Sequence, residues 1–494
     1  MKYANPNCKS EMKFEECELA ILRQAVDETE KETQEKIANS DEIKKMVVIV
    51  EQFIIKKKCI CYGGTAINNI LPKHAQFYNR DVEVPDYDFF SPNALKDAKE
   101  LADIYFKAGY QDVEAKSGIH FGTYKVFVNF IPMADITEMN VHLFHSLLKE
   151  AIDINGIHYA PANYLRMNMF IELSRPKGDV SRWEKVLKRL NLLNEYYPLG
   201  SENIDCQTVD FQRKMDSLTT ESEKIYFVTR DTFIEQEVIF FGGFASSLYS
   251  KYMPEETRHL VKSIPDFDVL SEDIELCASI LKHKLEKLNL VEKIHIIQHE
   301  AVDEIIPKHL EIRVGKEMIA FIYEPIACHN YNIITEEDTD KKKKEIRVAT
   351  IDTMLSFYLA FLYANKDYYY KDRILCIAKF LFDVEQKNRL EQKGLLKRFS
   401  IECYGKSNTL ENIRAEKAKK FQELKNRKNT EEYERWFLKY NPSEKKLQYY
   451  EKKKQTRYSK RRYHKKRGNI IQKIFSRSHR NRRHSRKKKD IWLI

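Results

Sequence analysis

The chain of 494 residues has few glycines, 14 in all, and contains neither a GxxxxGK[ST] motif nor a GxGxxG motif. A P-loop ATPase and a dinucleotide-binding enzyme of the usual kind are therefore excluded, since both bring backbone close to phosphate through such turns. The nine cysteines form no CxxC pair, which argues against a zinc site or a disulfide framework and favours a reducing compartment. The longest apolar run, near residues 354–364, is about half of the ~20 residues that cross a bilayer, so we expect no membrane partner.

Most of the chain also lacks an excess of positive charge, although the net charge of the whole chain is +11. Residues 451–494 hold 19 lysines and arginines against two acids, a net charge of +17, whereas residues 1–450 carry a net charge of −6. We expect a disordered tail that binds single-stranded RNA phosphates without reading sequence. Nuclear localisation, packaging on nucleic acid in a virion, and simple solubility are the competing interpretations of the tail.

The spacing of apolar residues predicts a mixed α/β (α+β) chain with several domains. Helices are expected over 10–57, 93–108, 160–198, 350–385 and 409–440, and strand-like runs lie near residues 58–62 and 124–131. The predicted parts are an N-terminal helical segment (1–48), an α/β domain with following helices (49–200), a linker (201–216), a second α/β domain (217–345), a helical region (346–450) and the basic tail (451–494).

An internal repeat becomes visible when the two Gly-Gly pairs are aligned. In the first repeat, Gly63-Gly64 is followed by Val-Pro-Asp86-Tyr-Asp88-Phe; in the second repeat, Gly242-Gly243 is followed by Ile-Pro-Asp266-Phe-Asp268-Val. The second glycine and the first aspartate are 22 positions apart in one repeat and 23 in the other. Either motif alone is as typical of a tight turn or a solvated strand end as it is of a functional site. The combination at matched spacing favours a shared function.

The chemistry of this combination points to metal and phosphate. Residues i and i+2 of a strand project from the same face, so Asp86 and Asp88 direct two carboxylates to one place, where they repel unless a cation neutralises them. Magnesium takes oxygen ligands from a few carboxylates and from substrate phosphates. The Gly-Gly pair and the helix after it offer backbone N–H groups to a phosphate.

A third carboxylate distinguishes the two repeats. When Pro132 is aligned with Pro325, Asp135 of the first repeat lies opposite Cys328 of the second. Two-metal phosphoryl transfer usually needs this additional acid, so we expect the first repeat to be catalytic and the second to be degenerate. Asn129 occupies an alternative position if the register differs, and ion binding without turnover remains open for Asp266 and Asp268.

These motifs resemble the nucleotidyltransferase superfamily that includes DNA polymerase β. The segments CYGGTAINNILP, VPDYDFFSP, FVNFIPMADITEM and RVATIDTMLSFYLAFLYAN are more similar still to the poly(A) polymerase catalytic subunit of large nucleocytoplasmic DNA viruses. The resemblance covers roughly residues 50–440. It implies tandem nucleotidyltransferase-fold domains, the second inactive, and template-independent addition of AMP from ATP to the 3′ end of viral mRNA.

The resemblance also implies a set of site residues and partners. Asp86, Asp88 and Asp135 would hold two Mg²⁺ or Mn²⁺ ions. The triphosphate of ATP would contact Gly63, Gly64, Thr65, Lys177 and Arg182, although residues 175–183 are equally typical of a helix cap with solvated cations. The implied partners are the mRNA 3′ end or poly(A), and either a second copy or a cap-methyltransferase subunit. The implied location is the host cytoplasm at the viral factory, or the virion.

Two other functions stay open from the sequence. One is a different terminal RNA nucleotidyltransferase, which adds CCA or mixed nucleotides. The other is a catalytically inactive RNA-binding scaffold, favoured by the degenerate second repeat and the basic tail.

Overall fold

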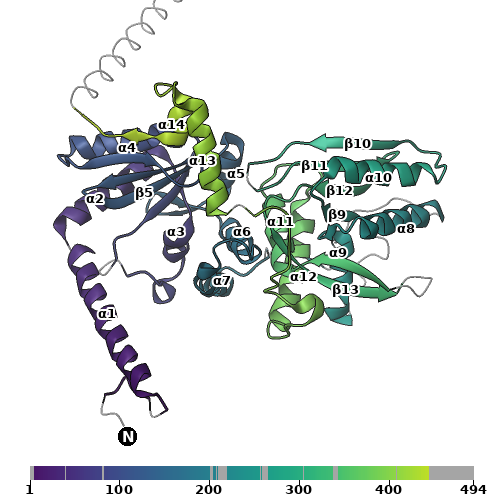
Figure 1. Ribbon diagram of the computed structural model, residues 1–494, viewed down its shortest axis with the longest axis horizontal. Coiled ribbons are helices and arrows are strands. Elements are labelled where there is room, and N and C mark those ends of the chain that lie inside the picture. Colours follow the sequence, from purple (N-terminus) through teal and green to yellow (C-terminus); the bar gives the residue numbers. More distant parts are fainter. Residues whose placement is uncertain are drawn as a thin grey trace, which may run out of the picture.

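The computed structural model describes residues 5–443 except for gaps at 10, 39, 80–82, 201–203, 207–208, 210–219, 256–257, 259–264, 304, 338–342 and 408. The predicted tail (451–494) and most of the predicted linker (201–216) lie outside the described residues. Within the described residues, no helix is both long and apolar enough to cross a membrane. Two lobes, each built on one sheet, lie side by side in Figure 1.

The first lobe is built on an eight-stranded mixed sheet with the order β16-β3-β4-β5-β2-β1-β7-β6. Helices α2 and α4 pack on one face, over buried side chains such as Tyr124 and Ile136, and the alternate residues face the other way. The strands are β1 (Ile60–Cys61), β2 (Tyr87–Ser91), β3 (Val113–Ser117), β4 (Thr123–Val128), β5 (Ile131–Glu138), β6 (Ile152–Ile154), β7 (Ile157–Tyr159) and β16 (Lys439–Tyr440).

Helices of the first lobe come from both ends of the chain. The predicted helices over 10–57, 93–108 and 160–198 are confirmed, the first and last as pairs of helices. They are α1 (Phe14–Ala38), α2 (Asp41–Lys57), α3 (Gly63–Ile70), α4 (Ala94–Lys107), α5 (Val141–Glu150), α6 (Ala162–Leu173) and α7 (Trp183–Tyr196). Helices α13 (Leu410–Leu424) and α14 (Glu431–Phe437) return from the second lobe and lie over the first lobe, beside β5 in Figure 1.

The second lobe repeats this plan on a sheet of order β10-β11-β12-β9-β8-β14-β13-β15. Its sheet includes residues 343–349, so the lobe extends beyond the boundary predicted at 345. The strands are β8 (Ile239–Phe240), β9 (Phe267–Leu270), β10 (Ile294–His299), β11 (His309–Val314), β12 (Glu317–Tyr323), β13 (His329–Glu337), β14 (Lys343–Ala349) and β15 (Cys403–Tyr404). The helices are α8 (Thr220–Glu235), α9 (Gly243–Tyr249), α10 (Ile274–Glu286), α11 (Ile351–Phe361) and α12 (Lys371–Lys387).

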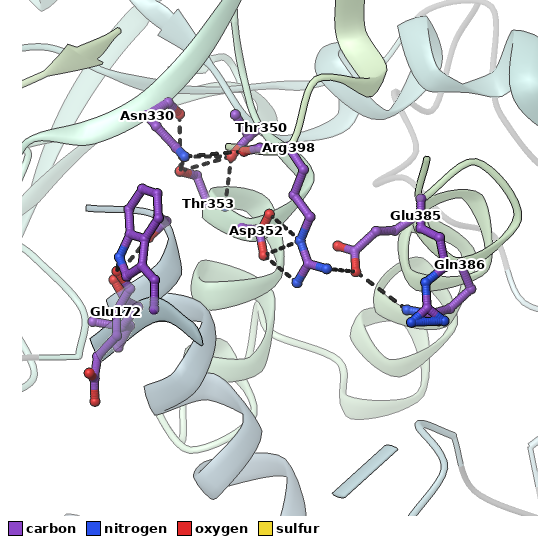
Figure 2. Close-up of polar contacts among 12 residues, drawn as sticks. Glu172, Asn330, Thr350, Asp352, Thr353, Glu385, Gln386 and Arg398 are labelled. Carbon is purple, nitrogen blue, oxygen red and sulfur yellow. Dashed lines mark hydrogen bonds and ion pairs between the residues drawn. The ribbon is translucent and has the colours of Figure 1, made fainter. Parts of the chain in front are cut away.

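The contact between the lobes is built on α11. This helix packs against α6 of the first lobe, and the rings of Tyr164 and Tyr363 meet with centroids 5.4 Å apart. Figure 2 shows how α11 is held from the other side: the buried Arg398 guanidinium donates to Asp352 of α11 at 2.9 Å and pairs with Glu385 of α12 at 3.1 Å. A buried charge is tolerated only when paired in this way, so the cluster joins both helices to the segment that leads to β15.

Three disulfides correct the expectation of a chain without any. They join Cys8 to Cys17, Cys206 to Cys376 and Cys328 to Cys403, while Cys59, Cys61 and Cys277 are buried free thiols. The two longer bridges close loops of 170 and 75 residues. The sequence did not reveal these pairs, because their partners meet only through the tertiary fold.

Candidate active site

The three predicted acids of the first repeat meet on two neighbouring strands. Strands β2 and β5 are parallel, and Asp88 lies directly opposite Asp135 in their register. Neighbouring strands are about 4.8 Å apart, so the two side chains stand next to each other on the face away from α2 and α4. Asp86 precedes Asp88 by two positions and projects to the same side. The strand register therefore places Asp135 beside Asp88.

Burial and crowding of these carboxylates together set the electrostatics of the site. Burial, then Asp86 and Asp135, raise the pKa of Asp88 to about 7. Burial and the neighbouring Asp135 also raise the pKa of Asp86. Lys125, directly opposite on β4, forms an ion pair with Oδ2 of Asp135, but Oδ1 of Asp135 is buried without a hydrogen-bond partner. The site carries more negative charge than one lysine neutralises.

The Gly-Gly pair links the buried strand β1 to helix α3 directly beside these acids. Gly63 has a φ of +73°, and a Cβ atom there would lie 2.6 Å from Oδ2 of Asp88, so only glycine fits. The Thr65 hydroxyl donates to the Asp86 carbonyl at 2.6 Å, and the Tyr62 N–H donates to the Asp88 carbonyl at 2.9 Å. These bonds fix the N-terminus of α3 against the strand that carries both aspartates.

A cation that the sequence analysis did not single out covers the second glycine. A Cβ atom on Gly64 would lie 2.9 Å from Nη1 of Arg189 and 2.8 Å from the Tyr78 hydroxyl. Arg189 donates to that hydroxyl and lies 5.0 Å from the centroid of the Phe77 ring. Asn68 holds this loop, since its Oδ1 accepts from the N–H groups of Phe77 and Tyr78. A guanidinium thus lies at the N-terminus of α3, where an anion would bind.

The predicted cations Lys177 and Arg182 are placed differently from each other. Arg182 lies close enough to Asp88 to lower the pKa of that carboxyl, and it pairs with Glu172 at 3.3 Å. Lys177 is exposed, and no contact among the described residues links it to the three aspartates. Arg182, at the N-cap of α7, and Lys185 and Arg189 within the helix are spaced i, i+3 and i+7, a spacing that gathers residues on one face of a helix. That spacing is the signal that could have revealed Arg189.

Asn129, the alternative to Asp135, lies away from the site. It occupies the turn between β4 and β5 with a φ of +50°, and its side chain donates to Glu42 of α2 at 2.8 Å.

The second repeat has the same arrangement of strands and Gly-Gly turn, but the side chains at the matched positions differ. Asp268 on β9 lies opposite Phe321 on β12, a fully buried ring, so an aromatic residue stands where the first repeat has Asp135. The expectation that Cys328 takes this position is wrong, because Cys328 follows the end of β12 and is bonded to Cys403. Asp266 and Asp268 are only 5% and 6% exposed, and Cβ atoms on Gly243 and Gly242 would overlap their carboxylates.

A metal site is not preformed in this arrangement. Within the described ranges, no three histidine, cysteine, aspartate or glutamate side chains come close enough together to hold one ion. A pair of parallel strands, a Gly-Gly turn into a helix and three nearby aspartates nevertheless form the arrangement expected for nucleotidyl transfer.

Comparison with known proteins bears directly on the segment that carries these residues. Residues 48–179 match the model of the family described as poly(A) polymerase catalytic subunit. This match covers 132 of the 494 residues. The match includes Gly63, Gly64 and all three aspartates, whereas Arg182 and Arg189 follow it.

Individual relatives agree with this family. A protein of African swine fever virus, provisionally named a poly(A) polymerase catalytic subunit, is 35% identical over 172 residues, which is 34% of this chain and 36% of the relative. A protein of Acanthamoeba polyphaga mimivirus with the same name is 30% identical over 173 residues, 34% of this chain and 27% of the relative. The chain thus spans about a third of the curated relatives it matches.

A solved structure extends the likeness of fold beyond the family segment. The crystal structure of the Megavirus polyadenylate synthase matches with a TM-score of 0.69 and 20% identity, over 85% of this chain and 86% of that one. Both lobes therefore share their fold with that protein, and the predicted α/β class is confirmed.

Proposed function

We propose that this protein transfers AMP from ATP to the 3′ end of RNA without a template, as a poly(A) polymerase of a large DNA virus. The observation that carries the proposal is the register of β2 and β5, which places Asp88 beside Asp135 next to a Gly-Gly turn. The family of residues 48–179 supports the choice of reaction. Viral mRNA in the host cytoplasm is the proposed setting.

The aspartates fit a divalent cation by their chemistry. They supply oxygen ligands that Mg²⁺ or Mn²⁺ prefers. Burial and the neighbouring carboxylates raise the pKa values of Asp86 and Asp88, and one buried oxygen of Asp135 has no hydrogen-bond partner. Asp86, Asp88 and Asp135 would hold the ions. When bound, such ions lower the pKa of an attacking hydroxyl and neutralise charge on the phosphates. Lys125 would then have to release Asp135, at least in part.

The positive side of the site suits the triphosphate. The N-terminus of α3 at Gly63 and Gly64 offers backbone N–H groups, and Arg189 adds a planar donor pair above Gly64. Arg182, at the N-cap of α7, lies close enough to Asp88 to lower the pKa of that carboxyl. These groups would orient the phosphates towards the aspartates, so that the 3′-hydroxyl of RNA attacks in line. Lys177 would reach the phosphates only after a change in conformation.

A primer-extension experiment tests the reaction and separates the alternatives. Purified protein is incubated with labelled oligo(A), Mg²⁺ or Mn²⁺ and each nucleoside triphosphate in turn. Long ladders with ATP alone are expected. Extension by a few nucleotides, or a preference for CTP, would instead identify another terminal nucleotidyltransferase. RNA binding without any extension under either metal would identify the inactive scaffold.

A further inference from the structure

Lys125 lies in line with two of the aspartates of the first repeat, across three neighbouring strands. It is directly opposite Asp135 in the antiparallel register of β4 and β5, and Asp135 is directly opposite Asp88 in the parallel register of β5 and β2. Residues that lie opposite each other in a sheet project from the same face, so the ammonium and the carboxylates share that face. A row of one cation and two acids therefore crosses the sheet at this level.

The ammonium of Lys125 is close to all three acids. Its Nζ pairs with Oδ2 of Asp135, and its charge lowers the pKa of Asp86 and of Asp88, against the larger opposite effect of burial. It satisfies only one side of Asp135, whose Oδ1 is buried without a hydrogen-bond partner. One monovalent cation thus stands among three carboxylates and leaves an excess of negative charge.

The sheet itself does not require a lysine at this position. Lys116 of β3 lies directly opposite Lys125, and like charges that face each other on neighbouring strands destabilise a sheet.

The second repeat shows the same backbone position without the lysine. Strand order makes β11 the equivalent of β4, and its Glu311 lies opposite Phe321, the residue that takes the place of Asp135. Glu311 pairs with His299 at 2.8 Å and with Arg313. The repeat without the third acid therefore carries an acid where the first repeat carries Lys125, so the lysine accompanies the third acid and not the fold.

We propose that Lys125 is a built-in substitute for the divalent cation: its ammonium holds Asp135 in the metal-free protein and leaves this carboxylate when a metal ion binds. Lys125 acts through Asp135 and is thus a positioning residue. Because ammonium and metal compete for the same carboxylate, Lys125 weakens metal binding to the free enzyme while it stabilises the empty site. The inference deepens the proposed function, since it rests on a divalent cation held by the three aspartates.

Binding of Mn²⁺ to the full-length protein without nucleotide tests the inference without catalysis, with free Mn²⁺ measured by electron paramagnetic resonance. Lys125→Met removes the charge and keeps an unbranched side chain, so Mn²⁺ should bind roughly 5- to 30-fold more tightly than to the wild type, the effect of a half-buried ion pair. Lys125→Arg keeps the cation and should retain the weak binding of the wild type. The matched control is Lys116→Met, since Lys116 lies on the same face one strand farther from Asp135 and should not matter.

The direction of the effect separates competition from a structural role, because loss of a merely structural lysine would disturb the site and weaken Mn²⁺ binding. The gain in affinity should disappear when Asp135→Asn is added to Lys125→Met, since the lysine acts through that carboxylate. In EDTA, Lys125→Met should melt at a lower temperature than the wild type, because the carboxylates lose their compensating charge, and saturating Mn²⁺ should remove the difference.

Three results would overturn the inference. They are unchanged or weaker Mn²⁺ binding in folded Lys125→Met, an equal gain in Lys116→Met, and a gain that persists when Asp135→Asn is added. If Lys125→Met does not fold, Lys125→Gln replaces it in the same measurements.

Failure of this inference and failure of the proposed function give different results. If the wild type extends no primer but Lys125→Met binds Mn²⁺ more tightly, the role of Lys125 stands and the reaction is wrong. If the wild type extends primers with Mg²⁺ and the Mn²⁺ affinity of Lys125→Met is unchanged, the reaction stands and the role of Lys125 is wrong.

Discussion

The two repeats have the same backbone but treat charge in opposite ways. In the first, Arg189 covers the second glycine and Asp135 faces Asp88, so charges of both signs remain available at the surface. In the second, the Asp266 carboxylate lies against the second glycine and Phe321 faces Asp268. In the second repeat the Asp266 side chain occupies the position at which an anion would bind, and the Phe321 ring replaces the third acid.

The contrast continues in the residues around each glycine pair. Thr65 of the first repeat donates to the Asp86 carbonyl, whereas Phe244, at the equivalent position, packs against Phe240 and Phe267 with ring centroids 4.8 and 5.5 Å away. The second lobe has exchanged polar groups for aromatic packing, which stabilises a fold and leaves little for a ligand. Repulsion left unresolved in the first lobe is the usual stability cost of an active site.

The largest expected difference between the repeats concerns the aspartate pairs. Asp86→Asn with Asp88→Asn should lower primer extension by more than about 10³-fold, because several kcal/mol of metal-dependent stabilisation is lost. Asp266→Asn with Asp268→Asn is the matched variant and should change the rate by less than about threefold. Initial rates with oligo(A) and ATP measure both, with thermal melts as the control for folding. A similar loss in both variants would show that the repeats are not divided as proposed.

Repulsion in the first repeat should be measurable as a pH-dependent cost in stability. The Asp88 carboxyl has a pKa of about 7, above the ordinary value of about 3.9, so the folded protein binds more protons than the unfolded chain between these values. Stability is therefore lost as the pH rises through that window. The free energy of unfolding of Asp88→Asn, relative to that of the wild type, should therefore increase by about 2 to 3 kcal/mol between pH 5 and pH 8. Urea unfolding in the presence of EDTA measures it.

Added Mg²⁺ provides the control for this measurement. It should stabilise the wild type at pH 8 and have little effect on Asp88→Asn. A difference between the two proteins that does not change with pH would contradict the assigned repulsion.

Removal of Arg189, the cation that covers Gly64 in the first repeat, should have a smaller effect, on ATP binding. Arg189→Ala should raise the KM for ATP by roughly 10- to 100-fold, the usual effect of losing hydrogen bonds to a charged group. Lys188→Ala is the matched control, since Lys188 is on the same helix but its exposed side chain pairs with Glu184. Steady-state extension at saturating primer measures both. An unchanged KM in Arg189→Ala would show that the triphosphate does not bind at Arg189.

The smallest effect on the rate of catalysis is expected from deletion of residues 451–494, which belong to neither repeat. If six cations of this tail meet phosphates, its loss should reduce the slope of log affinity against log salt by about 4, and extension should continue. An unchanged slope would leave RNA binding to the lobes alone.

Much of the first repeat was predictable, because its signals are local. The Gly-Gly turn, the alternation of Asp86 and Asp88 on one strand, and the helix over 94–107 all follow from short-range pattern. The position of Asp135 followed from its distance to Pro132. The same rule failed in the second repeat, since Pro132 lies inside β5 but Pro325 follows the end of β12, so the two prolines are not equivalent.

Features that depend on distant parts of the chain were not predictable. Arg189 reaches Gly64 only because α7 packs back on the lobe, and Tyr78 meets it through a loop held by Asn68. The Cys206–Cys376 bridge spans 170 positions with no local motif. A two-residue strand such as β16 is too short to produce any periodicity in sequence.

Strand β16 has a consequence for how the protein is made. Tyr440 pairs with Ala115, so the edge of the first sheet is completed by residues that leave the ribosome more than 300 positions after their partner. Contacts of such high sequence separation form late and slow folding. Until then β3 presents an unpaired edge, the kind of surface on which nascent chains aggregate. Fragments cut between the lobes should therefore be poorly soluble, and translation of almost the whole chain must precede a finished first lobe.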